Sequence, residues 1–330
     1  MRVLLDTSYA ARGMSGTAVY IERLAAALEG LDGIELIQAR QPRRLRRGGR
    51  NPLRSAVNAA LDWLWLHRGL PRAAREARVD VVHHPAPAYS SRIAAAQVAT
   101  VLDLAFLRHP EGYGRVWRLL AKRSYESAAS NCGALVCISE TVAGEVDAER
   151  VVVARLGPGQ ELPEVERRGE PRHFLYVGDD ERRKNVDGLV AAYERYRAAA
   201  GRPLELVLAG AAARRGGGEI SPTPARLAEL HAGAAALVHP ALDEGFGLTL
   251  VEAMTAGTPV IAVRTPAAAE VCGDAALLVG PDDLEDAMTR VAADPELRER
   301  LSAAGRRRAA DFSWDESARL HETAYTLALE

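Results

Sequence analysis

Cysteine is scarce in this sequence. Its three cysteines, Cys132, Cys137 and Cys272, are too few and too irregularly spaced for a disulfide framework or a zinc site. A reducing compartment such as the cytoplasm is therefore expected. Aromatic residues make up only 5% of the chain, but its 48% hydrophobic and 26% charged residues are ordinary for a globular protein, which excludes global disorder.

Long apolar runs and an excess of one charge are also missing. No stretch nears the ~18 apolar residues that span a bilayer, and the N-terminal residues 1–6 become polar before a signal-peptide core can form. The 42 basic and 44 acidic residues leave a formal charge of −2, which gives no overall attraction to nucleic acid. We expect a cytoplasmic chain, associated at most with the inner face of a membrane.

The length of 330 residues predicts two domains, because a single core rarely grows beyond about 250–300 residues. Short apolar runs alternate with Ala-, Leu- and Arg-rich stretches of helical period, which is the pattern of βαβ units around a parallel sheet. The predicted fold class is therefore α/β. Residues 151–167 combine glycines, prolines and mixed charges, as linkers do, so we predict domains at 1–165 and 166–312 and a final helix in 313–330.

The predicted elements follow from the periodicity and the turn residues of each segment. In the first half we predict strands at Arg2–Leu5, Val79–His83, Gln97–Val101 and Ala134–Ile138, and helices at Ala18–Leu28, Ala59–Ala77, Arg115–Ala129 and Thr141–Val146. In the second half we predict strands at Phe174–Val177, Leu204–Leu208, Ala235–His239, Pro259–Val263 and Ala276–Val279, and helices at Val186–Ala200, from Leu248, at Leu284–Ala293, at Pro295–Ala310 and after Trp314. Arg40–Arg54 and Ala211–Pro224 are predicted to be mobile loops.

The segment 244–250 has the form of a phosphate-binding turn. Gly245 and Gly247 allow close approach of a ligand to the backbone, and Leu248 and Thr249 supply N–H groups in the first turn of the predicted helix. These N–H groups and the helix dipole favour an anion. A Gly-x-Gly turn before a helix is equally an ordinary strand-to-helix connection, so the segment by itself leaves both interpretations open.

Residues 239–262 as a whole closely resemble the signature of the family 4 retaining glycosyltransferases. The resemblance is closest to the mannosyltransferase-like branch and extends over nearly the whole chain, through residues 15–20, 81–83, 103–110, 177–185 and 270–276. It implies a GT-B architecture, in which two Rossmann-like domains face a cleft. The first domain then binds the acceptor, the second binds the nucleotide sugar, and the final helix returns to the first domain.

The resemblance also implies a role for each matching residue. Glu252 accepts hydrogen bonds from the ribose hydroxyls, and Glu244 accepts them from the transferred sugar. Arg183 and Lys184 neutralise the diphosphate as negative charge builds on it. The implied catalytic group is Glu244, Lys184, Arg183 and Asp103, and the implied set that binds the sugar nucleotide is Glu252, Gly245, Phe246, Gly247, Leu248, Thr249, Gly178, Gly16 and Thr17.

The implied reaction moves a sugar from a nucleotide-sugar donor to an acceptor hydroxyl with retention of anomeric configuration. The donor is GDP-mannose-like or a UDP- or dTDP-sugar, and the acceptor is a small molecule, a glycan or a lipid-linked molecule. Members of the family need no metal and no other cofactor, because fixed cations and helix N–H donors stabilise the leaving diphosphate. They need no enzyme nucleophile either, because the leaving phosphate helps to deprotonate the acceptor. A nucleophilic Glu244, like the carboxylate of a retaining glycosidase, is the second option.

Three features depart from the family pattern. Leu102 stands where many relatives carry a histidine before Asp103, and leucine neither donates a hydrogen bond nor titrates. Asp179 follows the loop glycine where some branches place a phosphate-binding arginine. Between Leu208 and Ala232 relatives usually have a further helix and strand, whereas only a short stretch rich in glycine and proline is expected here, so Ser221, Thr223 or nearby backbone are candidates for reading the base.

These departures motivate a second hypothesis, in which the chain is a catalytically impaired glycosyltransferase-like protein that binds a sugar nucleotide or a partner without turnover. A GT-B epimerase or phosphorylase is disfavoured by the segment from Glu244 to Glu252. A nicotinamide-dependent oxidoreductase requires a third glycine where Leu250 stands, and no other strand supplies the pattern.

Other chemistry-bearing residues have simpler interpretations. His83 and His84 follow an apolar strand without carboxylates at ligand spacing, which favours loop structure over a metal site. Trp63 and Trp65 lie in an apolar stretch that fits a packed helix better than an acceptor or membrane contact. Seven arginines within 40–54 fit either a solvated loop or a site for an anionic acceptor or lipid headgroup.

Overall fold

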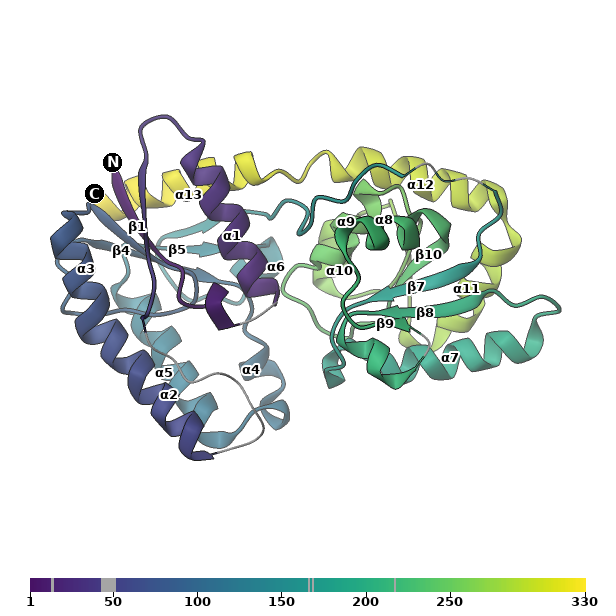
Figure 1. Ribbon diagram of the computed structural model, residues 1–330, viewed down its shortest axis with the longest axis horizontal. Helices are drawn as coiled ribbons and strands as arrows, with labels where there is room; N and C mark the ends of the chain where they lie inside the picture. Colours follow the sequence, from purple (N-terminus) through teal and green to yellow (C-terminus); the bar gives the residue numbers. More distant parts are fainter. Residues whose placement is uncertain (13–14, 43–51, 166, 168, 217) are drawn as a thin grey trace. The chain divides into compact units, whose positions relative to one another are not determined.

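The computed structural model describes residues 1–12, 15–42, 52–165, 167, 169–216 and 218–330 (Figure 1). The chain forms two compact units, one made of Met1–Leu156 and Trp314–Glu330 and the other of Gly157–Ser313. The first unit therefore ends at Leu156 rather than at the expected residue 165. Composition shows which segment is a linker, but not the residue at which the chain stops contacting the first unit and begins to contact the second. The final helix belongs to the first unit.

The first unit contains a six-stranded parallel sheet in the order β2-β1-β3-β4-β5-β6. Its strands are β1 (Arg2–Asp6), β2 (Glu35–Ala39), β3 (Val81–His84), β4 (Ala96–Val101), β5 (Ala134–Cys137) and β6 (Val151–Val153). β2 was not predicted, because it is an edge strand whose half-exposed residues lack a continuous apolar run. His83 and His84 are buried strand residues, so their interpretation as a loop is wrong.

The α-helices of the first unit are α1 (Gly16–Glu29), α2 (Pro52–Leu64), α3 (Leu70–Ala77), α4 (Ala105–Arg108), α5 (Arg115–Asn131), α6 (Glu140–Ala143) and α13 (Trp314–Leu329). α13 packs on α1 and on β4 and β5. A π-helical turn, Trp65–Gly69, joins α2 and α3 into one helical stretch. This stretch begins at Pro52 and not at the predicted Ala59. Most of the predicted arginine-rich loop, residues 43–51, lies outside the described residues.

The two tryptophans of the predicted packed helix differ in their surroundings. The Trp65 indole N–H donates to the Asp6 carboxylate at 3.0 Å, and its ring packs against a small core that includes Leu4 and Leu70. Trp63 is half-exposed. The prediction of a packed helix is thus confirmed for Trp65 alone.

The second unit contains a second six-stranded parallel sheet, in the order β12-β11-β10-β7-β8-β9. Its strands are β7 (His173–Val177), β8 (Glu205–Ala209), β9 (Gly218–Glu219), β10 (Ala234–His239), β11 (Val260–Val263) and β12 (Leu277–Val279). Its helices are α7 (Val186–Ala199), α8 (Pro224–Gly233), α9 (Leu248–Thr255), α10 (Pro266–Cys272), α11 (Leu284–Ala293) and α12 (Pro295–Ala309). α11 packs against α7, and α12 packs against α9.

The prediction that Ala211–Pro224 is only a mobile loop is wrong. It contains a 3-10 helix at Ala211–Arg215 and the short strand β9, and α8 follows it directly. Helix α8 begins at Pro224 because the Thr223 hydroxyl caps the Arg226 N–H at 3.2 Å and proline is tolerated in the first turn. Thr223 therefore has a structural role as a cap. The second unit has the additional helix and strand that seemed to be missing.

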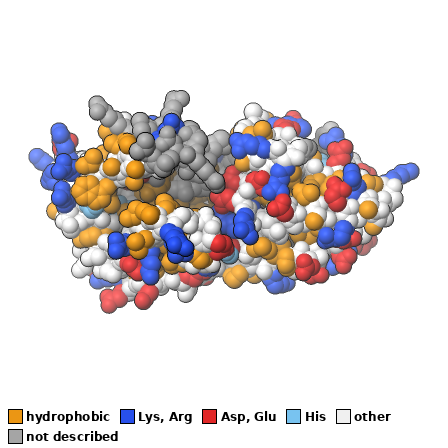
Figure 2. Space-filling view, turned by 90° about the horizontal axis from the view of Figure 1, so that it is seen from below, with side chains coloured by type: hydrophobic (Ala, Val, Ile, Leu, Met, Phe, Trp, Pro, Cys, Tyr) orange, Lys and Arg blue, Asp and Glu red, His pale blue; other side chains and the backbone are white. Residues whose placement is uncertain are grey.

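The surface carries charges of both signs. Figure 2 shows basic and acidic side chains interspersed over one face of the molecule, in keeping with the formal charge of −2.

A buried chain of polar side chains ties α13 to the rest of the first unit. His83 of β3 contacts the Tyr325 hydroxyl through Nδ1 and the Thr100 hydroxyl through Nε2, each at 2.8 Å. The Tyr20 hydroxyl lies 2.7 Å from the Thr100 hydroxyl and 2.8 Å from Nε2 of His321. All five side chains are fully buried, so each must find its partner within the chain.

One arrangement of protons satisfies this chain. Nδ1 of His321 lies 2.7 Å from the Ser317 carbonyl, which can only accept, so Nδ1 carries the proton and Nε2 accepts from Tyr20. The single Tyr20 proton is then used, so Thr100 donates to Tyr20 and His83 donates to Thr100. Both histidines are therefore neutral. Burial lowers the pKa of His83 well below its ordinary value and that of His321 to about 4.

We expect the first unit to lose stability in mild acid. A histidine in the unfolded chain has a pKa of about 6.5, whereas His321 in the folded chain has a pKa of about 4. Between these two pH values the unfolded chain therefore binds a proton at His321 and the folded chain does not. The unfolding free energy therefore falls, by about 2 kcal/mol between pH 7 and pH 5 from this residue alone. Denaturant titrations at several pH values measure the loss, which should be smaller by that amount in His321→Gln. An equal loss in wild type and variant would contradict the assignment.

Candidate functional site

The predicted site residues of the second unit lie at the carboxyl ends of two neighbouring strands. β7 and β10 pair in parallel in the middle of the sheet, although they are far apart in sequence. The chain runs from β7 outward through β8 and β9, and then returns to the other side of β7 to form β10. The carboxyl ends on either side of such a reversal are where ligands bind in open α/β sheets.

The loop after β7 brings two cations to this edge. Arg182–Lys184 form a 3-10 turn, and Asn185 adopts a left-handed conformation (φ 53°) before α7 begins. Gly178 lies at the end of β7, where a Cβ atom would come within 2.8 Å of the Tyr176 hydroxyl. That hydroxyl donates to the carbonyl of Asp179 at 2.7 Å and so ties the loop to the strand. Gly178 is thus a steric requirement of the loop.

The loop after β10 leads into α9, which begins at Leu248 as predicted. Gly247 has φ +102°, and a Cβ atom there would also come within 2.8 Å of the Leu250 side chain. Phe246 is buried, with its ring edge-to-face against Phe312 at a centroid distance of 5.7 Å. Its side chain therefore anchors the turn in the core, and only its backbone can serve a ligand.

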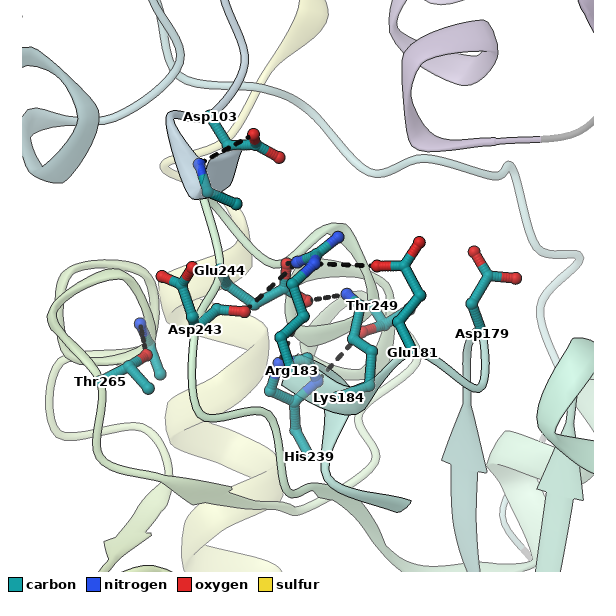
Figure 3. A network of polar contacts seen from close by, with 12 residues as sticks. Asp103, Asp179, Glu181, Arg183, Lys184, His239, Asp243, Glu244, Thr249 and Thr265 are labelled. Atoms are coloured by element: carbon teal, nitrogen blue, oxygen red, sulfur yellow. Dashed lines mark hydrogen bonds and ion pairs between the residues drawn. The ribbon is translucent and has the colours of Figure 1, made fainter. Parts of the chain in front are cut away.

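The two loops meet in an ion cluster around Glu244 (Figure 3). Arg183 Nη1 donates to Glu244 Oε2 at 3.1 Å and to the carbonyl of Asp243 at 3.3 Å, and Lys184 Nζ donates to Glu244 Oε1. The Arg183 Nε also donates to Glu181 at 2.9 Å, and the Leu242 N–H donates to the Arg183 carbonyl at 2.8 Å. Backbone and side-chain contacts thus both hold the two loops together. The predicted residues Glu244, Lys184 and Arg183 are in direct contact.

Glu244 is ionised in this setting. Its side chain is only 11% exposed, and burial by itself raises its pKa. The charges of Lys184 and Arg183, and that of His239 in the acid range where it is protonated, act in the opposite direction and outweigh burial, so that the pKa of Glu244 falls to about 2. At neutral pH the carboxylate is therefore a hydrogen-bond acceptor and not an acid.

His239 is a member of the site to which sequence reasoning assigned no role. It ends β10 and is buried, with Nε2 3.5 Å from Glu244 Oε1 and Nδ1 3.4 Å from the Thr249 hydroxyl. Burial above all, with the nearby cations, lowers its pKa to about 4 against the opposing effect of Glu244. It is therefore neutral at pH 7. The signal was a histidine at the end of an apolar strand, five residues before Glu244.

The remaining predicted residues of the second unit surround the start of α9. Leu248 and Thr249 form the first turn of the helix, directly after Gly245, Phe246 and Gly247. Glu252 lies in the second turn and is buried. The backbone turn, the ion cluster and Glu252 therefore all belong to one strand–turn–helix segment and the loop beside it.

The predicted residues of the first unit follow the carboxyl ends of β1 and β4. Gly16 and Thr17 open α1, whose first turn is capped by Ser15 through the Ala18 N–H at 3.2 Å. Asp103 lies between β4 and α4 and accepts the Ala105 N–H at 3.3 Å. Together with Leu102, which is half-buried, these residues belong to a different unit from Glu244.

Two further features are absent from the described residues. No three His, Cys, Asp or Glu side chains among them gather closely enough to hold a metal ion. No helix among them is long and apolar enough to cross a bilayer.

Comparison with known proteins identifies the second unit. Residues 160–308 match the family described as Glycosyl transferases group 1. The chain is 26% identical to the O-antigen chain mannosyltransferase B of Escherichia coli over 284 residues, which is 75% of this chain and 74% of that protein. It is 40% identical to the MMP alpha-(1->4)-mannosyltransferase of Mycolicibacterium hassiacum, over 110 residues that cover 31% of this chain and 27% of that protein.

A solved structure matches the fold of the whole chain. The sucrose-phosphate synthase of Thermosynechococcus elongatus superposes with a TM-score of 0.77 over 99% of this chain and 98% of its own, at 18% identity. The predicted resemblance and the predicted GT-B architecture are confirmed. This chain has the GT-B fold, is homologous to mannosyltransferases, and carries a glycosyl transferases group 1 domain at residues 160–308.

Proposed function

We propose that this chain transfers a sugar from a nucleotide-sugar donor to an acceptor hydroxyl, with retention of anomeric configuration and without a metal. The observation that carries the proposal is the ion cluster of Glu244, Lys184 and Arg183 beside the first turn of α9. It combines fixed cations, free helix N–H groups and an ionised carboxylate within one site. A sugar diphosphate needs these three kinds of group.

The cations and the helix act on the leaving group. As the bond between the anomeric carbon and the phosphate breaks, negative charge builds on the diphosphate, and preorganised charges stabilise it most effectively. Lys184 and Arg183 are held in place by Glu244, so they need little reorganisation when the phosphate arrives. The N–H groups at the start of α9 add to the same effect.

The carboxylates act on the hydroxyls. Glu244 is ionised, so it accepts hydrogen bonds from the transferred sugar, and Glu252 accepts them from the ribose. Both oxygens of Glu244 already bind cations, which weakens them as nucleophiles. This favours a mechanism in which the leaving phosphate deprotonates the acceptor, over one with a covalent sugar–Glu244 intermediate.

The similarity to mannosyltransferases supports a GDP-mannose-like donor, with UDP- and dTDP-sugars as the alternatives. The O-antigen chain named for the E. coli relative supports a glycan or lipid-linked acceptor. Gly16, Thr17 and Asp103 are the proposed contributions of the first unit. Among the described residues, and apart from its chain neighbours and its own helix backbone, nothing lies within 4 Å of a Cβ atom built at Gly16.

A thermal-shift panel of GDP-, UDP-, ADP- and dTDP-sugars tests the proposed site. We expect one nucleotide class to raise the melting temperature, because a ligand at 100 times its dissociation constant stabilises the fold by about 2.7 kcal/mol. For units of this size that corresponds to roughly 5–10 °C. The shift should shrink strongly in Glu252→Gln, which keeps the shape of the buried side chain but loses its charge.

The controls separate binding from turnover. Glu181→Gln changes an exposed carboxylate outside the proposed ribose contact and should leave the shift intact. The absence of any shift at millimolar concentration would remove the sugar-nucleotide premise. A normal shift without transfer to any acceptor would favour the hypothesis of a catalytically impaired protein, for which Leu102 is the motivating residue.

A further inference from the structure

The first half of α5 exposes a group of apolar side chains. The buried residues of this helix, Tyr125 and Ala128, lie in its second half. Ahead of them, the exposed fractions are 74% for Val116, 53% for Trp117, 50% for Leu119 and 52% for Leu120, and we call these four residues the α5 apolar stripe. Single exposed apolar residues are common, but four within two helical turns form a patch that needs an explanation.

Aromatic contacts hold Trp117 of the α5 apolar stripe in place. The Trp117 ring stacks on Tyr113 at a centroid distance of 4.9 Å and an interplanar angle of 14°, and it meets Phe106 of α4 edge-to-face at 6.1 Å. Phe106 is itself buried. One side of the Trp117 indole thus packs against other rings while the other side faces solvent. These contacts fix the position of the exposed side chain.

Basic residues run along the edge of the stripe. Arg115, Arg118 and Lys122 recur at intervals of three and four residues, so they share one face of the helix next to the apolar one. Within the described part of the chain, Arg115 and Arg118 have no ion-pair partner, and Lys122 pairs only with Glu126 at 3.6 Å. Figure 2 shows hydrophobic side chains with Lys and Arg side chains at their margin on the first unit.

We propose that the first half of α5 is a docking surface for an anionic lipid bilayer. A helix with Trp and Leu on one face and Lys and Arg on the next lies in the plane of the membrane interface, with its apolar face in the acyl boundary and its cations at the headgroups. A second copy of this chain fits less well, because a symmetric contact through the same stripe brings two sets of unpaired cations together.

This inference goes beyond the proposed function and does not depend on it. α4 and α5 directly follow the segment of Asp103, so the docked surface adjoins the end of β4. If the chain transfers sugar as proposed, this arrangement favours a lipid-linked acceptor, and that point alone rests on the proposed function. The bilayer contact is measured without any sugar donor, so its failure and that of the proposed function are separate results.

Co-sedimentation of the full chain with vesicles tests the surface. We expect binding to vesicles of phosphatidylcholine with about 30% phosphatidylglycerol, and much weaker binding to vesicles of phosphatidylcholine alone. Val116→Glu/Leu120→Glu should weaken binding by about 100-fold, since each lost apolar side chain is worth about tenfold. Arg115→Gln/Arg118→Gln/Lys122→Gln should also weaken it by about 100-fold, since each cation is worth about fivefold.

The control is Ile220→Glu, which places one negative charge on an apolar residue of the second unit that is as exposed as Leu120, and it should leave vesicle binding unchanged, whereas the single variant Leu120→Glu should already weaken it. Arg118 is partly exposed and the other substituted positions are exposed, so the melting temperature should stay close to that of the wild type. Absence of binding to the anionic vesicles would overturn the proposal, as would equal binding by wild type and the α5 variants. A dimer in sedimentation velocity that depends on Trp117, without vesicle binding, would show self-association instead.

Discussion

Replacing Glu244 by glutamine is expected to lower the kcat/KM of sugar transfer by about 10- to 100-fold. The variant keeps the size of the side chain but removes the charge that holds Lys184 and Arg183 in place. It also replaces a charged acceptor of sugar hydroxyls by a neutral one. Hydrogen bonds to charged groups are worth about 1.5–3 kcal/mol, and about 1.4 kcal/mol corresponds to a factor of ten in rate.

Glu181→Gln is the matched control for this variant. Glu181 also binds Arg183, at 2.9 Å, but its side chain is 55% exposed, so its ion pair contributes little. We expect its steady-state kinetics to stay close to those of the wild type. Equal effects of the two substitutions would mean that Glu244 only helps to position Arg183 and does not touch the sugar.

Replacing Gly247 by alanine is expected to destabilise the second unit by about 2–5 kcal/mol. A residue with a Cβ atom is strained at φ +102°, at a cost of about 1–2 kcal/mol. The new methyl group would also lie 2.8 Å from the buried Leu250 side chain, and overpacking typically costs another 1–3 kcal/mol. Thermal unfolding followed by circular dichroism measures the loss as a lowered melting temperature.

Two further glycines separate the causes of this loss. Gly216 also has a positive φ, of +104°, but a Cβ atom there meets nothing within 4 Å, so Gly216→Ala reports backbone strain without the clash. Gly201→Ala has neither problem and should match the wild type. A melting temperature of Gly247→Ala equal to that of the wild type would show that the turn after β10 rearranges freely, against the preorganised site proposed above.

Much of the second unit was predictable because its signals are local. The helix α9 begins at the predicted Leu248, since a glycine turn followed by an apolar helical period is visible within a dozen residues. The helices α8 and α10 were missed although each begins with the same local signal, a threonine cap followed by proline, at Thr223 and Thr265. Both lie in segments where glycine, proline or alanine obscured the apolar period.

The buried partners in the first unit were not predictable from spacing. His83 and His321 belong to one hydrogen-bonded chain although more than 200 residues separate them, and nothing near either residue indicates the other. The sequence shows His239 at the end of its strand, but only the folded conformation of the turn after β10 places it next to Glu244.

The sequence by itself determined the α/β class, the alternation of strands and helices and the glycine turn that opens α9, because propensity, period and turn chemistry act between near neighbours. The residues of the ion cluster came from the resemblance to a glycosyltransferase family and not from these local signals. Only the tertiary structure decided that β10 pairs with β7, and hence that Lys184 and Arg183 meet Glu244, about 60 residues further along the chain. It also decided that Trp65 is packed while Trp117 is exposed. Strand order and burial depend on how distant segments share one core, and no local pattern encodes that choice.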